Sequence, residues 1–147
     1  MTRVRAERDA SGSVAEAETV WYEPARWASW VEGFGHVVSI QGPWPQAGAE
    51  VIWQSRPGGR GRVTERVVSH EPGAGQELEV TDDSLTGRQT VRFEALADGV
   101  SVSVVLDYRL RRRLPAGALV DRLFIRRALA DSLRRTLGRF AAELADR

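Results

Sequence analysis

An arginine on an apolar helical stripe is the residue with the clearest potential for binding chemistry. At about 100° per residue, Arg126 falls within about 20° of the helical face that carries Leu119, Leu137 and Leu144. A guanidinium that faces inward there would form paired hydrogen bonds with a ligand carboxylate, phenolate or phosphate. Alternatively, its aliphatic stem packs on the protein while its charged head reaches water or a nearby acid. The sequence leaves both alternatives open.

Two uncharged polar side chains share the inward faces of predicted strands with apolar residues. Tyr108 lies on the same strand face as Leu106, and Gln89 lies on the same face as Val91 and Phe93. A buried hydroxyl or amide needs a partner, which a ligand, a cavity water or a backbone group can supply. Aromatic and aliphatic neighbours would give such a site its apolar walls, although ordinary core packing also explains them. The predicted ligand-contacting residues are Trp30, Trp53, Gln89, Val91, Phe93, Tyr108, Arg126 and Leu133.

The residues that usually carry catalysis or hold a metal are scarce in this chain. There is no cysteine, and the two histidines, His36 and His70, do not form a spacing typical of zinc sites. No serine lies in a G-x-S-x-G frame. Alternation with Thr64 and Arg66 predicts that His70 faces solvent. We therefore predict no catalytic residue, no metal and no cofactor.

Length and composition predict a single domain over residues 1–147. Apolar residues make up 42% of the chain, which is typical of a globular protein. No apolar run approaches ~18 residues, and the first residues are charged, so we expect no membrane span and a cytoplasmic location. All 21 basic residues are arginine, and 10 of them lie in residues 111–147 against 4 acids.

The hydropathy pattern predicts one strand, two short helices, six more strands and a long helix. The strands have a period of two and are joined by turns rich in glycine, proline and aspartate. Ser13 and Glu16 form a capping box at the start of the first helix. The predicted strands are Thr2–Asp9, Val37–Gln41, Ala49–Ser55, Arg62–His70, Glu77–Thr81, Thr86–Leu96 and Val100–Leu110, and the predicted helices are Val14–Tyr22, Pro24–Trp30 and Ala118–Ala145.

One apolar stripe runs along the long helix through Leu119, Leu123, Leu133, Leu137, Phe140 and Leu144. Only this helix is large enough to cover the apolar face of the sheet. The predicted fold class is therefore α+β, with a curved antiparallel sheet of about seven strands around the C-terminal helix. Such a sheet leaves a pocket between itself and the helix.

This order of elements, with the stretches Thr19-Val20-Trp21, Arg26-Trp27-Ala28-Ser29-Trp30 and Leu119 to Leu129, resembles the START-like superfamily. That superfamily has the helix-grip fold and includes the Bet v 1 allergens, lipid-transfer START domains and bacterial polyketide cyclase/dehydrase-like (SRPBCC) proteins. The resemblance implies that a small hydrophobic molecule binds between sheet and helix. In the aromatase/cyclase branch, the strand similar to Arg62–His70 tends to carry a cavity arginine near its end, where this chain has His70 or Glu71.

Three functions follow as hypotheses. The first is reversible binding of a small hydrophobic or aromatic ligand, lipid-like or polyketide-like, in a pocket of about 300 Å³ or more. The second is an enzyme, a polyketide cyclase or dehydratase, which would need a base that we do not identify. The third is an interaction module that uses the arginine-rich helix on an acidic partner. Nucleic acid is not expected because Asp121, Asp131 and Glu143 interleave with the arginines. Val120, Phe124 and Ile125 lie off the main stripe and could either pack under loops or form a homodimer patch.

Overall fold

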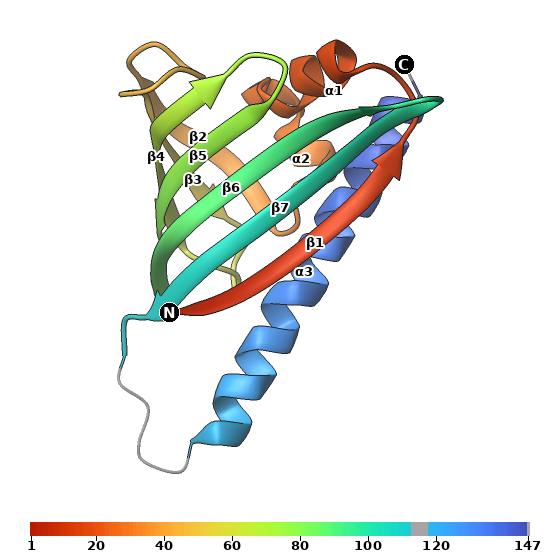
Figure 1. Cartoon of the computed structure of the whole chain (residues 1–147). Coiled ribbons are helices and arrows are strands. Elements are labelled where there is room, and N and C mark those ends of the chain that lie inside the picture. The colour runs from red at the N-terminus through yellow and green to blue at the C-terminus, as the bar shows by residue number, and fades with distance from the viewer. Residues whose placement is uncertain (113–117, 147) are drawn as a thin grey trace.

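The computed structural model describes residues 1–112 and 118–146, which form a curved sheet wrapped around one long helix (Figure 1). Two short helical segments follow the first strand, and the long helix ends the chain. The elements are β1 (Thr2–Ala10), α1 (Val14–Trp21), the 3₁₀ turn η1 (Pro24–Arg26), α2 (Trp27–Trp30), β2 (Phe34–Gln41), β3 (Glu50–Ser55), β4 (Arg62–Glu71), β5 (Gly75–Thr81), β6 (Leu85–Leu96), β7 (Gly99–Leu110) and α3 (Leu119–Ala145).

The seven strands form one antiparallel sheet in the order β1-β7-β6-β5-β4-β3-β2. From β2 to β7, strands that follow each other along the chain are neighbours in the sheet. The first strand, β1, pairs with the last, β7. In Figure 1 the long strands β6, β7 and β1 run beside α3, while β2 to β5 curl away to form the other wall. This arrangement confirms the predicted helix-grip fold.

The alternation of the last strand sets the main layer of the core. Val100, Val102, Val104, Leu106 and Tyr108 are all buried on one face of β7. The second half of α3 covers this face with Leu137, Phe140 and Leu144. Helix α1 is fixed at its start by the predicted capping box, in which Ser13 and Glu16 exchange two hydrogen bonds of 3.1 Å.

The first two turns of α3 do not cover the sheet, and the prediction of one continuous buried stripe was wrong there, since the packing on the sheet begins only at Leu129. Leu119 is 65% exposed and Leu123 is 55% exposed. Figure 1 shows the start of α3 extending past the ends of the strands. Helical periodicity places these leucines on the face of Leu133 and Leu137, but they lie across an open hollow from the ends of β1 and β7 and do not pack in a core cluster of the described residues.

A β-bulge in β4 changes which residues at the end of this strand face the interior of the protein. Val67 pairs with Leu78 and Ser69 pairs with Glu77, so one extra residue of β4 lies between them. His70 is consequently opposite Gln76, which is buried, and its ring packs edge-on against Tyr22 at 5.1 Å. His70 is therefore half-buried, and the prediction that it faces solvent was wrong because alternation does not continue through a bulge.

Candidate functional site

A small cavity lies between the concave face of the sheet, the short helices and the middle of α3. Its volume is about 80 Å³, well below the roughly 300 Å³ expected for a drug-sized ligand. Helix α3 contributes one wall through Ser132, Leu133, Thr136 and Leu137. The opposite wall comes from side chains of β3 to β7. The cavity thus occupies the position between sheet and helix where the sequence predicted a pocket, with less open space than predicted.

All five tryptophans of the chain line this cavity. They reach it from four different segments, namely α1, α2, the loop before β3, and β3 itself. The indole N–H of Trp27 donates to the carbonyl of Trp21 at 2.9 Å, and that of Trp44 donates to the carbonyl of Tyr22 at 2.8 Å. Trp21 and Trp30 lie 4.7 Å apart, ring centre to ring centre. The five residues are Trp21, Trp27, Trp30, Trp44 and Trp53.

Polar side chains enter the same cavity from three neighbouring strands. Glu65 comes from β4, Gln76 from β5 and Gln89 from β6. The side-chain amide of Gln76 donates to the carbonyl of Pro45 at 2.8 Å, which leaves its buried Oε1 without a partner among the described residues. The buried Nε1 of Trp30 likewise meets no acceptor in the part of the chain that the structure describes. Two residues that line the cavity, Gln76 and Trp30, thus carry a buried acceptor and a buried donor without a hydrogen-bond partner among the described residues.

Glu65 is the carboxylate of this site. It lies on β4 between the buried residues Val63 and Val67, and its Oε1 accepts a 3.3 Å hydrogen bond from the indole of Trp53. Burial raises the pKa of Glu65 above its ordinary value of 4.5, against the opposing effects of Arg60 and of the Trp53 hydrogen bond. This environment favours the neutral carboxylic acid relative to an exposed glutamate.

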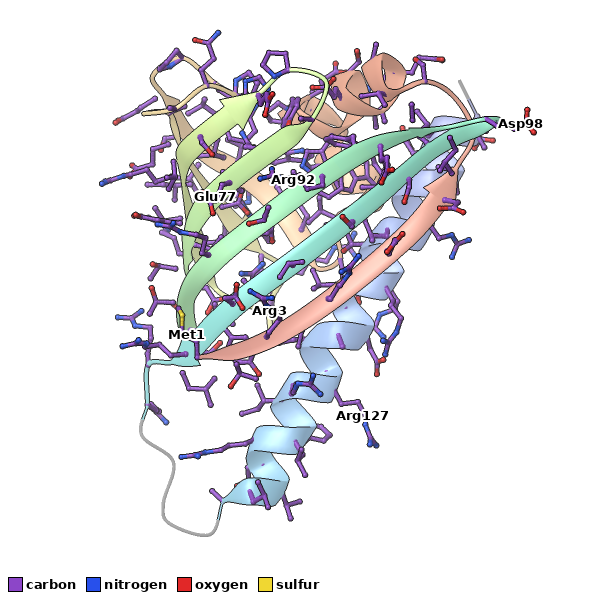
Figure 2. The ribbon with its side chains drawn as sticks, viewed as in Figure 1. Met1, Arg3, Glu77, Arg92, Asp98 and Arg127 are labelled. Carbon is purple, nitrogen blue, oxygen red and sulfur yellow. The ribbon has the colours of Figure 1, made fainter. Side chains whose placement is uncertain are left out.

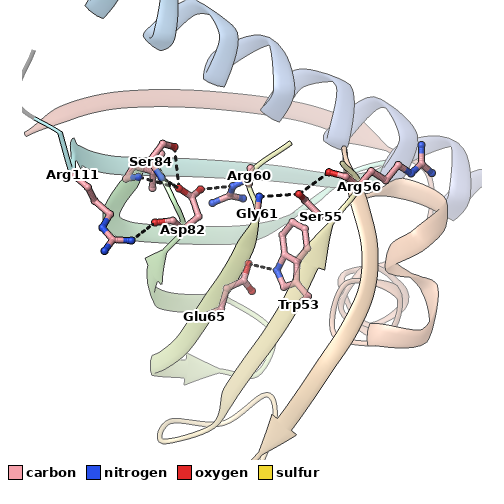
Figure 3. A network of polar contacts seen from close by, with 10 residues as sticks. Trp53, Ser55, Arg56, Arg60, Gly61, Glu65, Asp82, Ser84 and Arg111 are labelled. Atoms are coloured by element: carbon pink, nitrogen blue, oxygen red, sulfur yellow. Dashed lines mark hydrogen bonds and ion pairs between the residues drawn. The ribbon is translucent and has the colours of Figure 1, made fainter. Parts of the chain in front are cut away.

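Arg60 lines the cavity but is already paired with Asp82 (Figure 3). Its Nε donates to Asp82 at 2.7 Å, and its guanidinium carbon lies 5.7 Å from the ring centre of Trp53. Asp82 also accepts from the backbone N–H groups of Ser84 and Leu85 at 2.8 and 3.0 Å. The charge of Arg60 is therefore largely balanced at the cavity.

The pKa of Asp82 shows that these contacts outweigh the cost of burial. Burial by itself would raise the pKa, but Arg60 and the backbone N–H groups lower it overall. Arg111 extends the network by donating to the backbone carbonyl of Asp82 at 2.8 Å. As Figure 3 shows, Asp82 thereby joins the end of β5 to Arg60 and to the end of β7.

The structure divides the predicted site residues among three places. Trp30, Trp53, Gln89 and Leu133 line the cavity. Val91 and Phe93 are buried in the core cluster beside it and do not line it; Phe93 packs edge-on against Trp21 at 6.0 Å. Tyr108 and Arg126 line a different hollow, so the set is not brought together at one point.

This second hollow has a volume of about 430 Å³ and lies between the first residues of the chain, the end of β7 and the start of α3. The Nε of Arg126 donates to the backbone carbonyl of Arg3 at 3.3 Å, so this guanidinium contacts β1 and does not point into the tryptophan-lined cavity. Burial raises the pKa of Tyr108, while Arg126 acts in the opposite direction. Tyr108 belongs to a small core cluster with Val4, Leu85 and Leu106.

Glu65 and Gln76 are cavity residues that the sequence analysis missed. The pattern Val63-x-Glu65-x-Val67 carried a usable signal, because it places a carboxylate on the apolar face of a predicted strand. Gln76 lay just outside the predicted strand Glu77–Thr81, whereas β5 begins at Gly75. Among the described residues, no group of three or more histidine, aspartate or glutamate side chains could hold a metal ion.

Comparison with known proteins agrees with the architecture. The family model described as polyketide cyclase / dehydrase and lipid transport matches residues 1–145. No significant match was found among curated protein sequences.

Solved structures share the fold at low sequence identity. The protein TTHA0849 from Thermus thermophilus is similar with a TM-score of 0.76 and 15% identity, covering 99% of this chain and 98% of that one. Ara h 8.0201 has a TM-score of 0.68 and 10% identity, covering 99% of both chains. A norcoclaurine synthase point mutant from Thalictrum, in complex with a transition-state analogue, has a TM-score of 0.68 and 12% identity and covers 99% and 94%. With the family model spanning nearly all of its residues, the chain belongs to the polyketide cyclase/dehydrase and lipid transport family.

Proposed function

We propose that the protein reversibly binds a small, uncharged, largely aromatic molecule in the tryptophan-lined cavity. The observation that carries this proposal is the convergence of all five tryptophans on one space that Gln76 also lines, with the buried Gln76 Oε1 and Trp30 Nε1 lacking hydrogen-bond partners among the described residues. Flat apolar rings favour a flat apolar guest through burial and ring packing. The two unpartnered polar atoms would orient a hydroxyl or carbonyl group of that guest.

The electrostatics of the cavity favour a neutral guest. Arg60 is paired with Asp82, and the raised pKa of Glu65 reflects an environment that disfavours its charge. A ligand carboxylate would have to compete with Asp82 for Arg60, and a ligand cation would need a charged Glu65 in surroundings that disfavour that charge. A ketone, phenol or alcohol on an aromatic frame needs neither change. This description covers polyketide-like and other aromatic ligands.

The small volume requires the cavity to open when the guest enters. A space of about 80 Å³ has room for only a few water molecules, each of which takes roughly 30 Å³ in the liquid. The wall formed by α3 is the most easily displaced, since Ser132, Leu133 and Thr136 keep partial exposure and only Leu137 is buried. Outward movement of this wall would enlarge the cavity without breaking the hydrogen bonds of the sheet.

A pair of tryptophan substitutions on α3 tests the proposal. Leu133→Trp places a large ring on a residue that lines the cavity, whereas Leu129→Trp is one turn away and packs on the cluster of Val4, Leu85, Leu106 and Tyr108. Native mass spectrometry of freshly purified protein would detect a retained ligand, and quenching of intrinsic tryptophan fluorescence would follow titration with aromatic ketones and phenols. We expect Leu133→Trp to lose the ligand and the quenching, and Leu129→Trp to keep both. Equal binding by the two variants would refute a site at this cavity.

Glu65 favours a second candidate function, catalysis of a cyclisation or dehydration on a bound polyketone. Its carboxylate could remove a proton next to a carbonyl, and the enolate carbon would attack a second carbonyl to form a carbon–carbon bond. Glu65 would then return the proton to the new alkoxide. A raised pKa suits a group that must both take and give a proton near neutral pH.

Glu65→Gln separates this candidate from simple binding. The amide keeps the size of the side chain and an acceptor for Trp53, so ligand affinity should change less than threefold. Conversion of a poly-β-ketone to cyclised product, followed by absorbance and mass spectrometry, should fall at least 100-fold if Glu65 is the acid and base. Cyclisation at an unchanged rate in this variant would remove the catalytic assignment while leaving the binding site in place.

A further inference from the structure

The start of α3 exposes a group of large apolar side chains. Val120 is 76% exposed, Phe124 73%, Leu119 65% and Leu123 55%. At about 100° per residue, these four side chains fall within an arc of about 140° on one side of the helix. They lie on the part of α3 that extends past the ends of the strands in Figure 1, and none of the four belongs to a core cluster of the described residues. Such a concentration of exposed apolar surface marks an interaction site.

Arginines accompany this apolar surface, and in the described part of the chain they have no acidic partners. Arg127 lies within the apolar arc and, in Figure 2, points away from the body of the protein. Arg122 and Arg126 fall along one edge of the arc, and Arg112 lines the adjoining hollow together with both of them. Among the described residues, Arg112, Arg122 and Arg127 form no ion pair, and Arg126 contacts only a backbone carbonyl.

The second half of α3 shows that this lack of partners is local. Arg135 and Arg139 both pair with Glu32, and Arg134 pairs with Asp131. The first twelve residues of α3 carry three arginines and a single acid, Asp121. The start of the helix therefore keeps its positive charge available for another molecule.

We propose that this end of the protein, formed by Leu119, Val120, Leu123 and Phe124 with Arg112, Arg122, Arg126 and Arg127, docks on an anionic lipid surface. The apolar side chains would enter the boundary between headgroups and acyl chains, and the arginines would contact lipid phosphates. No helix in the described part of the chain is long and apolar enough to cross a membrane. This inference does not depend on the tryptophan-lined cavity.

Charge decides against a second copy of the chain as the occupant. A symmetric dimer through this surface would bring the arginines of one copy against those of the other, with only Asp121 nearby on each helix to offset them. Nucleic acid would use the arginines but would leave the four apolar side chains in water. An anionic lipid surface satisfies both parts, because its phosphates match the arginines and its acyl chains match the apolar residues.

Co-sedimentation of the full chain with lipid vesicles tests the docking. We expect the protein to bind phosphatidylcholine vesicles that contain phosphatidylglycerol, to bind pure phosphatidylcholine vesicles far more weakly, and to be released by added salt. Val120→Ser with Phe124→Ser should weaken binding more than tenfold. Arg122→Gln with Arg127→Gln should weaken it by about fivefold for each arginine. All four positions are exposed, so these variants should fold as the wild type does, which circular dichroism would verify.

Matched changes on the far edge of the sheet serve as controls. Val38→Ser with Ile40→Ser removes two exposed apolar side chains of β2, and Arg56→Gln with Arg62→Gln removes two exposed arginines. Both control variants should bind vesicles as the wild type does. The proposal would be overturned by absence of binding to phosphatidylglycerol vesicles or by equal losses in the control variants. It would also be overturned if the α3 variants instead abolished self-association in sedimentation velocity, or abolished binding to RNA, with vesicle binding unchanged.

Discussion

The indole N–H of Trp53 donates a hydrogen bond to the carboxylate of Glu65, 3.3 Å away on the neighbouring strand. The two residues are diagonal neighbours, since Trp53 pairs with Val63 and Glu65 pairs with Val51. Strand pairing therefore places a titratable carboxyl against an aromatic wall of the cavity. Burial raises the pKa of that carboxyl, and the hydrogen bond only partly offsets the effect. The stability of the fold should consequently report on the protonation of Glu65.

Glu65→Gln should change how stability depends on pH. The folded-state pKa lies above that of the unfolded chain, so the folded state holds its proton more tightly. The protonated Glu65 side chain then makes its full contribution to the stability of the fold below the unfolded pKa of about 4.3. This contribution is lost as the pH rises through the folded pKa. As the pH rises from about 4 toward neutrality, the wild type should therefore lose stability relative to Glu65→Gln. The free energy of unfolding of the variant minus that of the wild type should increase over this range.

Urea unfolding at a series of pH values measures this difference. Glu79→Gln is the matched control, because Glu79 lies on the neighbouring strand β5 and faces solvent. Glu65→Gln should diverge from wild type with pH more than Glu79→Gln does, because Glu65 lines the cavity and Glu79 is exposed. If the free energies of unfolding of wild type and Glu65→Gln changed in parallel with pH, the surroundings of Glu65 would not disfavour its charged form.

Asp82→Asn should destabilise the protein by about 2–4 kcal/mol at neutral pH, because the change removes the charge partner of a partly buried arginine and weakens several hydrogen bonds. Asp82 is 2% exposed and contacts Arg60, Ser84 and Leu85. Its pKa is lowered in the folded state, so its contribution is present above the unfolded pKa and is lost as the pH falls through the folded value. Thermal unfolding at pH values from neutral to acidic should show the difference between Asp82→Asn and wild type shrinking on acidification.

The exposed pair of Arg3 and Asp107 provides the comparison for this network. Their side chains meet at 2.8 Å at the surface of the paired strands β1 and β7, and the Arg3 side chain is 69% exposed. Because exposed ion pairs contribute little, Asp107→Asn should destabilise the protein much less than Asp82→Asn. Equal effects of the two substitutions would contradict a special contribution from the Arg60–Asp82 contact.

Alternation and helical periodicity predicted the order of the elements and part of the site. Gln89 and Trp53 were found because a period of two assigns residues to faces without any knowledge of what lies opposite. The same pattern contained Glu65 between Val63 and Val67, so the carboxylate was accessible to sequence reasoning and was overlooked. The position of His70 was not accessible, since a bulge in β4 leaves no mark in the hydropathy pattern.

Periodicity also gives no measure of distance along an element. Tyr108 shares a face with the cavity residue Val104, but four residues of strand separate them by roughly 13 Å, which places Tyr108 at the other hollow. Leu123 likewise shares a helical face with Leu137, yet only the latter lies over the sheet. A hydropathy pattern tells which side chains share one face of a strand or helix. Which of them are buried depends on how far the element packed against that face extends.

Gly138→Ala should stabilise the protein by about 0.5–1 kcal/mol, because alanine has the higher helix propensity and restricts the unfolded chain. Gly138 lies inside α3, and a methyl group there would meet nothing closer than the guanidinium of Arg8 at 3.6 Å. Gly87→Ala is the contrasting change, since its methyl group would clash with the backbone carbonyl oxygen of Asp107. Guanidinium unfolding should show a gain for the first variant and a clear loss for the second. A loss for Gly138→Ala would mean that α3 packs more tightly against β1 than this contact indicates.

Glu32→Gln should speed the exchange of ligand at the cavity while leaving the fold nearly as stable. Glu32 lines the cavity and holds α3 through Arg135 at 3.1 Å and Arg139 at 2.8 Å, and its backbone N–H donates to Thr136 Oγ1 at 3.1 Å. Both arginines are about half exposed, so the two ion pairs together contribute about 1 kcal/mol at most. They nevertheless connect α3 to the segment after α2, which must separate from it if the helical wall moves outward.

Stopped-flow tryptophan fluorescence with an aromatic ketone that binds the wild type measures the effect. We expect Glu32→Gln to raise the association and dissociation rate constants by a similar factor, about threefold to fivefold, so that the affinity changes little. Asp131→Asn is the matched control, because it breaks an ion pair with Arg134 on the same helix without touching the cavity. Equal exchange rates in Glu32→Gln and Asp131→Asn would mean that a guest enters without separating α3 from Glu32, and the opening would then have to be sought between the short helices and β3.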